Sequence, residues 1–257
     1  MLSSMSMMKP ADPEPQHDPE GATRLFNQWH VYRSIVDANW MAHREIFSAT
    51  RAWVLARYPG PFTLLDLGCG DAGLIQGTFD GTGLWAYVGV DASRGPIAKA
   101  RNALIGARFR RQLLEADMLA YLREEAVPAA KTFDVILASY AVHHLPVREK
   151  REFFRLAHGS LALRGTLLFA DVFRRDGESR EEYLDAYVAM MRTMWVGMTP
   201  ESLASTSEHV TQRDFPETTE DLFAMSREAG FRGEPRELFR DAAGFHRLVA
   251  FTIGDLA

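Results

Sequence analysis

The chain has 257 residues, 47% of them hydrophobic, and a formal net charge of −5 at pH 7. This length and composition can fill a sizeable core, and the acidic balance gives no general attraction to nucleic acid or to an anionic membrane. A single cysteine, Cys69, excludes an internal disulfide framework and suits a reducing compartment. Because the sequence has neither a signal-peptide core nor a run of about 18 apolar residues, we expect a cytoplasmic globular protein.

The N-terminal part divides into a leader and a helical segment. Residues 1–21 contain four prolines and show no helix or strand period, which predicts a disordered leader. Apolar residues then recur at helical spacing over residues 22–59, which predicts two helices that form a cap. Their aromatic stripe fits packing against the main domain, or a pocket mouth lined by Trp29, Tyr32 and Trp40.

The most informative stretch is an apolar run over residues 64–67 that leads into Gly68, Gly70 and Gly73. The run predicts a buried strand, and the glycines predict a turn whose backbone N–H groups approach a ligand at the start of the next helix. The glycine spacing also satisfies the dinucleotide pattern G-x-G-x-x-G. Asp66, however, places a negative charge beside the loop, which would repel a pyrophosphate and suits a cationic ligand.

Helices and strands alternate after this loop. Such alternation predicts right-handed crossovers, a mostly parallel sheet, and ligands bound outside the carboxyl ends of the strands. Acids stand at three of these strand ends, namely Asp91, Asp117 and Asp171. The predicted elements in chain order are a helix over 74–79, a strand over 84–90, a helix over 97–104, strands over 109–114 and 133–138, a helix over 148–161 that Arg164 and Gly165 stop, and a strand over 166–170.

An insertion over about residues 172–216 interrupts the alternation. Its predicted helix, over 178–198, carries tyrosines and methionines on one broad face, which fits packing on the N-terminal helices, a wall over an apolar substrate, or both. The remaining predicted elements are a helix over 218–229 with Thr218 or Thr219 as N-cap and Gly230 as C-cap, and two strands over 231–239 and 246–253 around the turn 241–244.

Four ordered motifs between about residues 60 and 171 resemble those of the class I S-adenosylmethionine-dependent methyltransferases of small-molecule type. They are the loop 66–70, the segment 89–93, the pair 117–118 and the segment 133–146. The resemblance implies an α/β, Rossmann-like, doubly wound fold. It also implies a mostly parallel seven-stranded sheet with an antiparallel last strand, a helical cap, and a cofactor-binding domain over residues 60–257.

The resemblance further implies S-adenosylmethionine as the cofactor. Asp91 is the acid expected on the ribose, and Asp117 with Met118 is expected to flank the adenine. The positions that match the family's cofactor site are Asp66, Gly68, Cys69, Gly70, Gly73, Asp91, Ala92, Asp117, Met118 and Ser139.

The activity implied by the resemblance is transfer of a methyl group to an O, N or C atom of a small, partly apolar molecule. The alternative is a regulatory protein or pseudoenzyme that holds S-adenosylmethionine without methyl transfer. His143 is the first candidate base, because it follows the fourth strand, where the acceptor should meet the cofactor, and histidine titrates near neutral pH. His144, Tyr32 and Tyr140 are the other candidates, whereas Cys69 is expected to be a packing residue.

Missing motifs narrow the acceptor further. Methyltransferases that act on flipped bases carry an Asn or Asp followed by two prolines and an aromatic residue after the fourth strand. Residues 138–141 of this chain are Ala, Ser, Tyr and Ala instead, so a nucleic-acid base is disfavoured as the acceptor. Ser139 and Asp171 would make a poor pair of oxygen ligands, so no metal is predicted. The expected partner is a small-molecule acceptor, with no nucleic acid and no membrane, and a homodimer is left open.

Overall fold

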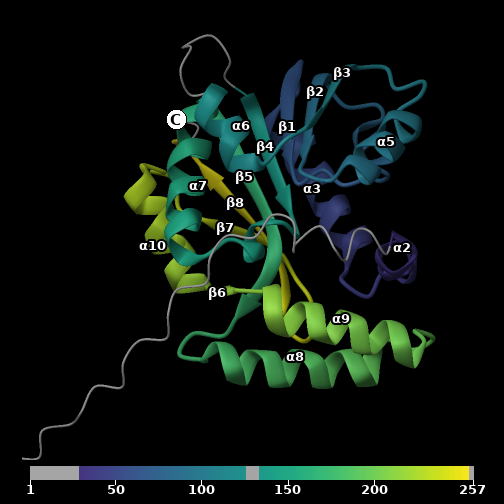
Figure 1. The fold of residues 1–257 in the computed structure, drawn as a ribbon. Coiled ribbons are helices and arrows are strands. Elements are labelled where there is room, and N and C mark those ends of the chain that lie inside the picture. The colour runs from purple at the N-terminus through teal and green to yellow at the C-terminus, as the bar shows by residue number, and fades with distance from the viewer. Residues whose placement is uncertain (1–28, 126–132, 255–257) are drawn as a thin grey trace, which may run out of the picture.

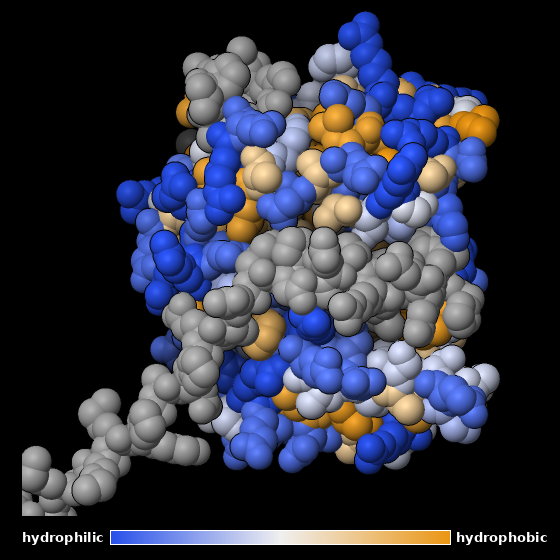
Figure 2. All heavy atoms as spheres, in the orientation of Figure 1, coloured by the Kyte–Doolittle hydropathy of each residue, from blue (hydrophilic) through white to orange (hydrophobic). Residues whose placement is uncertain are grey.

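The computed structural model describes residues 29–125 and 133–254 of the chain (Figure 1). The leader predicted over residues 1–21 lies outside these residues. Hydrophilic side chains dominate the face of the molecule drawn in Figure 2, with small apolar patches between them. None of the helices within the two described ranges combines the length and the apolar character needed to cross a lipid bilayer.

A twisted sheet forms the centre of the fold. Its strands in the described ranges are β1 (Phe62–Leu67), β2 (Leu84–Asp91), β3 (Arg110–Glu115), β4 (Phe133–Ser139), β5 (Leu161–Arg174), β6 (Glu217–Thr218), β7 (Arg236–Arg240) and β8 (His246–Thr252). Along the order β3-β2-β1-β4-β5-β8-β7, the first five strands are parallel and β8 runs antiparallel to both of its neighbours. The predicted fold class is confirmed, and the two-residue β6, which pairs with the end of β5, adds to the seven predicted strands.

Helices cover both faces of the sheet (Figure 1). They are α2 (Trp29–Ala38), α3 (His43–Arg57), α4 (Ile75–Phe79), α5 (Arg94–Ala103), α6 (Met118–Glu125), the 3-10 helix η1 (Val142–His144), α7 (Val147–Ser160), α8 (Arg180–Met194), α9 (Pro200–Arg213) and α10 (Thr219–Ala229). α3, α4 and α5 pack on one face, and α6, α7 and α10 pack on the other. α8 and α9 lie side by side beyond the end of β5.

Neighbouring residues of the central strands enter opposite cores. Leu64 belongs to the core beneath α3, and Leu65 belongs to the core beneath α7. This alternation explains why the strands read as continuous apolar runs, since both faces of the sheet are buried. Asp66 lies on the same face as Leu64, so its carboxylate points towards α3 and the other N-terminal helix.

Helix ends follow local capping signals. Ser179 accepts from the Glu182 amide and its own amide donates to the Glu182 carboxylate, which is a capping box at the start of α8. Thr218 accepts from the Asp221 amide and Gly230 ends α10 with φ of 107°, so both predicted caps of this helix are confirmed.

Two boundaries were predicted wrongly around the fifth strand. α7 ends at Ser160 and β5 begins at Leu161, so Arg164 and Gly165 lie inside the strand at a register shift instead of stopping the helix. The strand also continues past Asp171 to Arg174, because β8 pairs with it as far as Val172 and β6 pairs beyond. Asp171 is therefore inside β5 and not at its tip.

The insertion and the penultimate strand also differ from the prediction. The insertion contains a second helix, α9, that was not predicted; Thr199 caps it and Pro200 occupies its first turn. α8 is shorter than the helix predicted over 178–198. β7 begins only at Arg236 because Pro235, just before it, cannot donate to the strand ladder.

Candidate active site

The glycine loop between β1 and α4 is fastened to the neighbouring strand by its own backbone. The amides of Gly68 and Cys69 donate to the Val90 carbonyl over 2.8 and 3.0 Å. Gly68 has φ of 76° and Gly70 has φ of 54°, a left-handed conformation that glycine adopts at little cost. The loop is therefore a tight turn at the carboxyl end of β1, as the glycine spacing predicted.

Gly68 also packs too closely for a side chain. A Cβ on this residue would lie 2.4 Å from the Cβ of Ala141. We expect Gly68→Ala to lower the free energy of unfolding by about 2 kcal/mol, from the positive φ and the forced displacement of the loop. Denaturant unfolding measures this, with Gly77→Ala as the matched control, since a Cβ on Gly77 of α4 meets nothing within 4 Å. Equal stability of the two variants would contradict the prediction.

Asp91 holds the loop from the end of β2. Its two carboxylate oxygens accept from the amides of Gly70, over 2.9 Å, and Ser93, over 2.8 Å. Burial raises the pKa of Asp91, and these two amide hydrogen bonds oppose the shift. Ala92, beside it, is exposed.

Asp117 and Met118, which follow the end of β3, make different contacts. The Asp117 carboxylate accepts from the Ala120 amide over 2.8 Å and so caps α6. The Met118 Cε lies 3.9 Å from the position that a Cβ on Gly68 would take. The fold thus brings Met118 against the glycine loop, whereas Asp117 is engaged with the first turn of its own helix.

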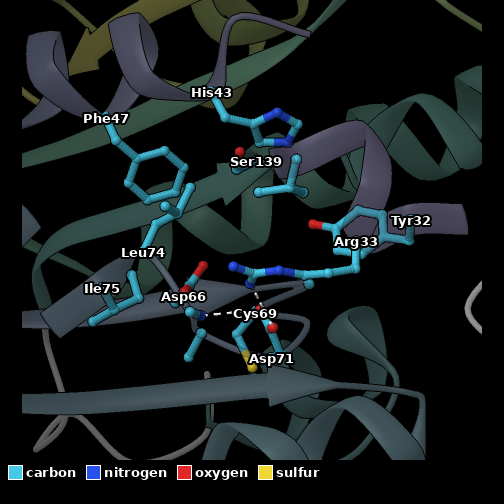
Figure 3. Close-up of a pocket in the computed structure, with 14 residues that line it drawn as sticks. Tyr32, Arg33, His43, Phe47, Asp66, Cys69, Asp71, Leu74, Ile75 and Ser139 are labelled. Atoms are coloured by element: carbon cyan, nitrogen blue, oxygen red, sulfur yellow. Dashed lines mark hydrogen bonds and ion pairs between the residues drawn. The ribbon is translucent and has the colours of Figure 1, made fainter. Parts of the chain in front are cut away.

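A cavity beside the glycine loop, called here the loop cavity, lies between the N-terminal helices and the end of the sheet (Figure 3). Tyr32 and Arg33 come from α2, and His43 and Phe47 come from α3. Five of the predicted cofactor residues line this cavity: Asp66, Gly68, Cys69, Gly73 and Ser139. The other five lie outside its lining: Gly70, Asp91, Ala92, Asp117 and Met118.

Asp66 gives the loop cavity a buried negative charge. The residue is 3% exposed, and its carboxylate accepts from the Tyr87 hydroxyl over 2.9 Å. Burial raises the pKa of Asp66 to about 7, although the Tyr87 hydrogen bond opposes the shift. In the described ranges no cationic side chain forms an ion pair with Asp66. A buried carboxylate in this state fits a ligand that brings its own positive charge.

A second cavity, called here the histidine cavity, adjoins the first. Tyr32 and His43 line both cavities. The polar side chains of the histidine cavity include His143, His144, His209 and Asp214, and its apolar and aromatic walls include Ile35, Met41, Tyr140, Tyr187, Trp195 and Val210.

His143 lies between two buried carboxylates. Its Nδ1 pairs with Asp171, whose other oxygen accepts from the His143 amide over 3.1 Å, and its Nε2 lies 3.6 Å from Asp214 Oδ1. Burial lowers the pKa of His143, but the charges of Asp171 and Asp214 outweigh it and the net shift is upwards. Asp171 thus occupies Nδ1 of the ring, and Nε2 remains available on the side of the histidine cavity.

The other candidate bases are less well placed. The Nδ1 of His144 lies 3.2 Å from the Arg213 carbonyl, and burial lowers the pKa of this histidine. The Tyr140 hydroxyl donates to the Met41 carbonyl, and burial raises its pKa. Tyr32 stands near the loop, its hydroxyl 3.9 Å from the place of a Cβ on Gly70, and burial raises its pKa as well.

Cys69 is buried in the loop, and burial raises the pKa of its thiol. A raised pKa keeps the thiol protonated and unreactive, which agrees with a packing role.

His43 and Asp214 line the histidine cavity and were not predicted from the sequence, whereas Trp195 belongs to the predicted helix over 178–198, one face of which was expected to form a wall over the substrate. In the described part of the chain, both ring nitrogens of His43, the indole nitrogen of Trp195 and Asp214 Oδ1 are buried without a hydrogen-bond partner. Asp214 follows α9, a helix that was not predicted, so no motif spacing pointed to it. His43 begins α3, where a histidine carries no periodic signal.

Comparisons with known proteins agree with the geometry of the loop. Residues 65–167 match a family model described as a methyltransferase domain. A 60-residue segment is 37% identical to an uncharacterized methyltransferase of Alkaliphilus oremlandii, covering 23% of this chain and 28% of that one. The chain thus spans little more than a quarter of the length of the curated relative it matches.

Two solved structures share the fold. Magnesium protoporphyrin IX methyltransferase from Synechocystis, with bound S-adenosylhomocysteine, is 14% identical; the match covers 92% of this chain and 100% of that one, with a TM-score of 0.63. The 1,6-didemethyltoxoflavin-N1-methyltransferase of Burkholderia thailandensis is 18% identical, covers 96% and 94% of the two chains, and has a TM-score of 0.58.

The strand order defines a Rossmann-like fold, and the loop cavity lies at the carboxyl ends of the strands, where open sheets of this kind bind their ligands. The match of residues 65–167 to a methyltransferase domain agrees with the resemblance to the class I S-adenosylmethionine-dependent methyltransferases that the sequence shows. The cofactor of this class is S-adenosylmethionine. The loop cavity fits that cofactor, because Asp66 is a buried carboxylate with no cationic partner among residues 29–125 and 133–254, and the cofactor carries an ammonium and a sulfonium.

If Asp66 binds the ammonium of S-adenosylmethionine, as its buried charge predicts, the affinity for this cofactor depends on pH. The ionised form of Asp66 is the one that attracts the ammonium, so affinity rises with pH through its pKa of about 7. We expect about tenfold tighter binding at about pH 8 than at about pH 6, measured by calorimetry. Asp66→Asn should bind weakly at both pH values. A wild-type affinity that stays constant across this range would contradict the assignment.

The titration of Asp66 changes the stability of the ligand-free protein in the opposite direction, because this stability falls as the pH rises. Its pKa in the folded, ligand-free protein exceeds that of an unfolded chain, so the folded state binds more protons. The contribution of Asp66 to stability is complete at acidic pH and is lost as the pH rises to about 7.

Proposed function

We propose that this chain transfers a methyl group from S-adenosylmethionine to an O, N or C atom of a small, partly apolar molecule. The observation that carries the proposal is that the two cavities are neighbours, since Tyr32 and His43 line both of them. A cofactor in the loop cavity and an acceptor in the histidine cavity would then meet at these two side chains. Methyl transfer needs such a meeting, because the reacting atoms must lie in line.

The walls of the histidine cavity support an acceptor that is mainly apolar with a few polar atoms. Met41, Tyr187 and Val210 offer apolar surface. His43 and Trp195 present buried nitrogens that have no partner among the described residues. Because unpaired buried polar groups are costly, a ligand that both donates and accepts hydrogen bonds would satisfy them.

The cofactor supplies an electrophilic methyl group when it is bound. The chain itself orients the acceptor, excludes water and, where the reacting atom carries a proton, removes it. We infer that His143 receives this proton at Nε2, since Asp171 occupies its Nδ1 and stabilises the imidazolium that forms. Asp214 Oδ1, 3.6 Å away, adds a second negative charge beside the ring.

Helices α2, α3, α8 and α9 would form the cover over the acceptor. Trp40, between α2 and α3, stacks on Trp195, which follows α8, with ring centroids 5.4 Å apart and an interplanar angle of 7°. This stack connects the N-terminal helices with the insertion, and Trp195 also lines the histidine cavity. The division into an N-terminal cap and an inserted cover is part of the proposal.

The test has two stages. Calorimetry with S-adenosylmethionine and S-adenosylhomocysteine measures cofactor binding, and transfer of a labelled methyl group into a metabolite extract measures turnover. Binding together with labelling of a small molecule is the expected result. Binding without labelling of any molecule, across many extracts, would favour the regulatory alternative, and a complete lack of binding would refute both.

A further inference from the structure

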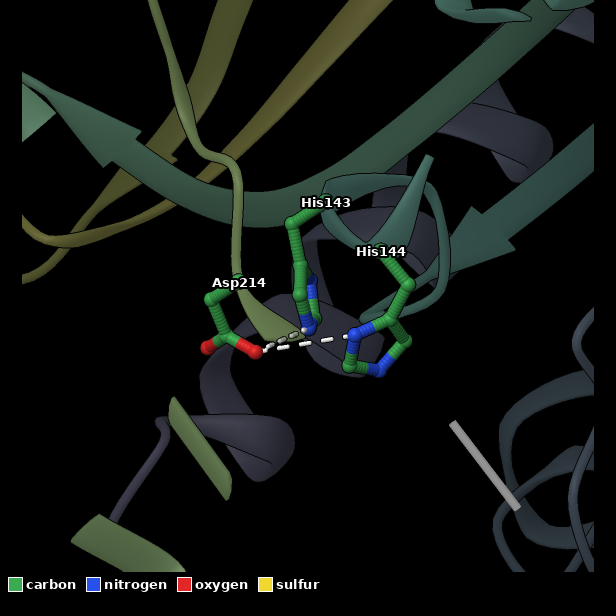
Figure 4. A group of neighbouring side chains, drawn as sticks. All are labelled: His143, His144 and Asp214. Carbon is green, nitrogen blue, oxygen red and sulfur yellow. Dashed lines mark ion pairs between the residues drawn. The ribbon is translucent and has the colours of Figure 1, made fainter. Parts of the chain in front are cut away.

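Three side chains that could ligate a metal ion lie together in the histidine cavity (Figure 4). His143 and His144 come from η1, and Asp214 comes from the segment that follows α9. Their ligand atoms all lie within 4.8 Å of one another. We propose that His143, His144 and Asp214 bind one divalent metal ion of the zinc class. The site goes beyond the proposed methyl transfer, and it departs from the absence of a metal that the sequence predicted.

The spacing of the ligand atoms suits a small tetrahedral ion. Asp214 Oδ1 lies 3.6 Å from His143 Nε2 and 3.5 Å from His144 Nδ1. Ligand atoms placed about 2.1 Å from a tetrahedral ion are roughly 3.4 Å apart. Both separations are too long for a hydrogen bond, so an ion can enter between these atoms with little movement of the chain.

Asp214 Oδ1 is the strongest sign that the cluster is incomplete. Asp214 is 4% exposed, and this oxygen has no hydrogen-bond partner in the described part of the chain. A buried carboxylate oxygen without a partner costs free energy unless something neutralises it. Lys150 does not serve, because its ammonium is paired with Glu217 over 2.7 Å. A cation held between Asp214 and the two histidines would supply the missing partner.

Asp171 prepares His143 as a ligand. It pairs with His143 Nδ1, an arrangement that orients many metal-binding histidines and leaves Nε2 for the ion. His144 Nδ1 lies 3.2 Å from the Arg213 carbonyl, and this contact would give way when the same nitrogen binds the ion.

Three protein ligands leave a fourth position, and the lining of the histidine cavity surrounds it. Sites of this kind keep the open position for water or a substrate. An acceptor oxygen or nitrogen at that position would lose its proton to solvent water more easily. The ion and the proton compete for His143 Nε2, so metal binding would replace the role of His143 as base. Only this catalytic consequence rests on the proposed function; the metal site does not.

The test uses the full chain without an affinity tag, stripped with a chelator. Titration with Co²⁺ reports the site through the visible absorption of a four-coordinate ion, and competition with Zn²⁺ followed by elemental analysis gives the stoichiometry. We expect one ion per chain. His144→Gln and Asp214→Asn should each weaken metal binding about 100-fold.

Matched variants away from the cluster are His158→Gln, on α7, and Asp185→Asn, on the exposed side of α8. They should bind the metal as the wild type does. Far-ultraviolet circular dichroism and thermal unfolding check that every variant is folded, independently of the metal, of the cofactor and of turnover. Absence of stoichiometric binding, or equal metal affinity in folded His144→Gln, Asp214→Asn and the two controls, would overturn the metal site and leave the proposed methyl transfer untouched.

Discussion

Asp91→Ala should weaken the binding of S-adenosylmethionine about 100-fold, close to 3 kcal/mol. Two effects add. The variant removes the carboxylate predicted to meet the ribose, and it removes the acceptor for the Gly70 and Ser93 amides. Calorimetry with S-adenosylmethionine measures the loss directly.

Asp91→Asn separates these two contributions. An amide oxygen can still accept from one backbone amide, but the group carries no charge, so we expect a loss intermediate between wild type and Asp91→Ala. Asp185→Ala, an exposed acid on α8, serves as the control for a general change of charge. If Asp91→Ala bound the cofactor as tightly as this control, the assignment of Asp91 would fail.

His143→Gln should lower kcat by a factor of about 100 or more while the affinity for S-adenosylmethionine changes less than about threefold. Glutamine can hydrogen-bond to Asp171 but can neither take a proton at neutral pH nor replace an imidazole ligand. The loss should therefore appear in single-turnover labelling of the acceptor, with cofactor binding preserved.

The control for this variant must keep the cavity and change another histidine. His158→Gln on α7 meets that need, since His158 packs against Phe231 and lines neither cavity. Normal turnover by His143→Gln would remove His143 from the chemistry, whether as base or as metal ligand. A parallel loss of cofactor affinity would assign it a structural role instead.

The sheet and the glycine loop could be predicted because their signals are local. Residues 64–67 and 133–138 are apolar apart from Asp66 and Asp134, since helices cover both faces of the sheet. The loop needs glycine where φ is positive. The resemblance to a methyltransferase rested on these same segments. The ends of β5 and β7 were less predictable, because pairing with β8 and the position of Pro235 determine them.

The acceptor side of the site could not be predicted in the same way. Asp214 and Trp195 belong to the insertion, and they reach His143 only through the packing of α8 and α9 beyond the sheet. His43 lies 100 residues before His143 in the chain and meets the same cavity through the fold alone. Side chains brought together by tertiary packing leave no common spacing in the sequence, whereas a loop that binds through consecutive residues does.

The parallel stack of Trp40 and Trp195 gives this protein a built-in optical reporter. Two indoles at 5.4 Å with planes 7° apart have coupled electronic transitions, which produce a paired signal in the circular dichroism spectrum. If entry of the acceptor separates the N-terminal helices from the insertion, the separation would abolish that signal. The rate at which the signal disappears and returns would then time each opening of the enzyme without any attached label.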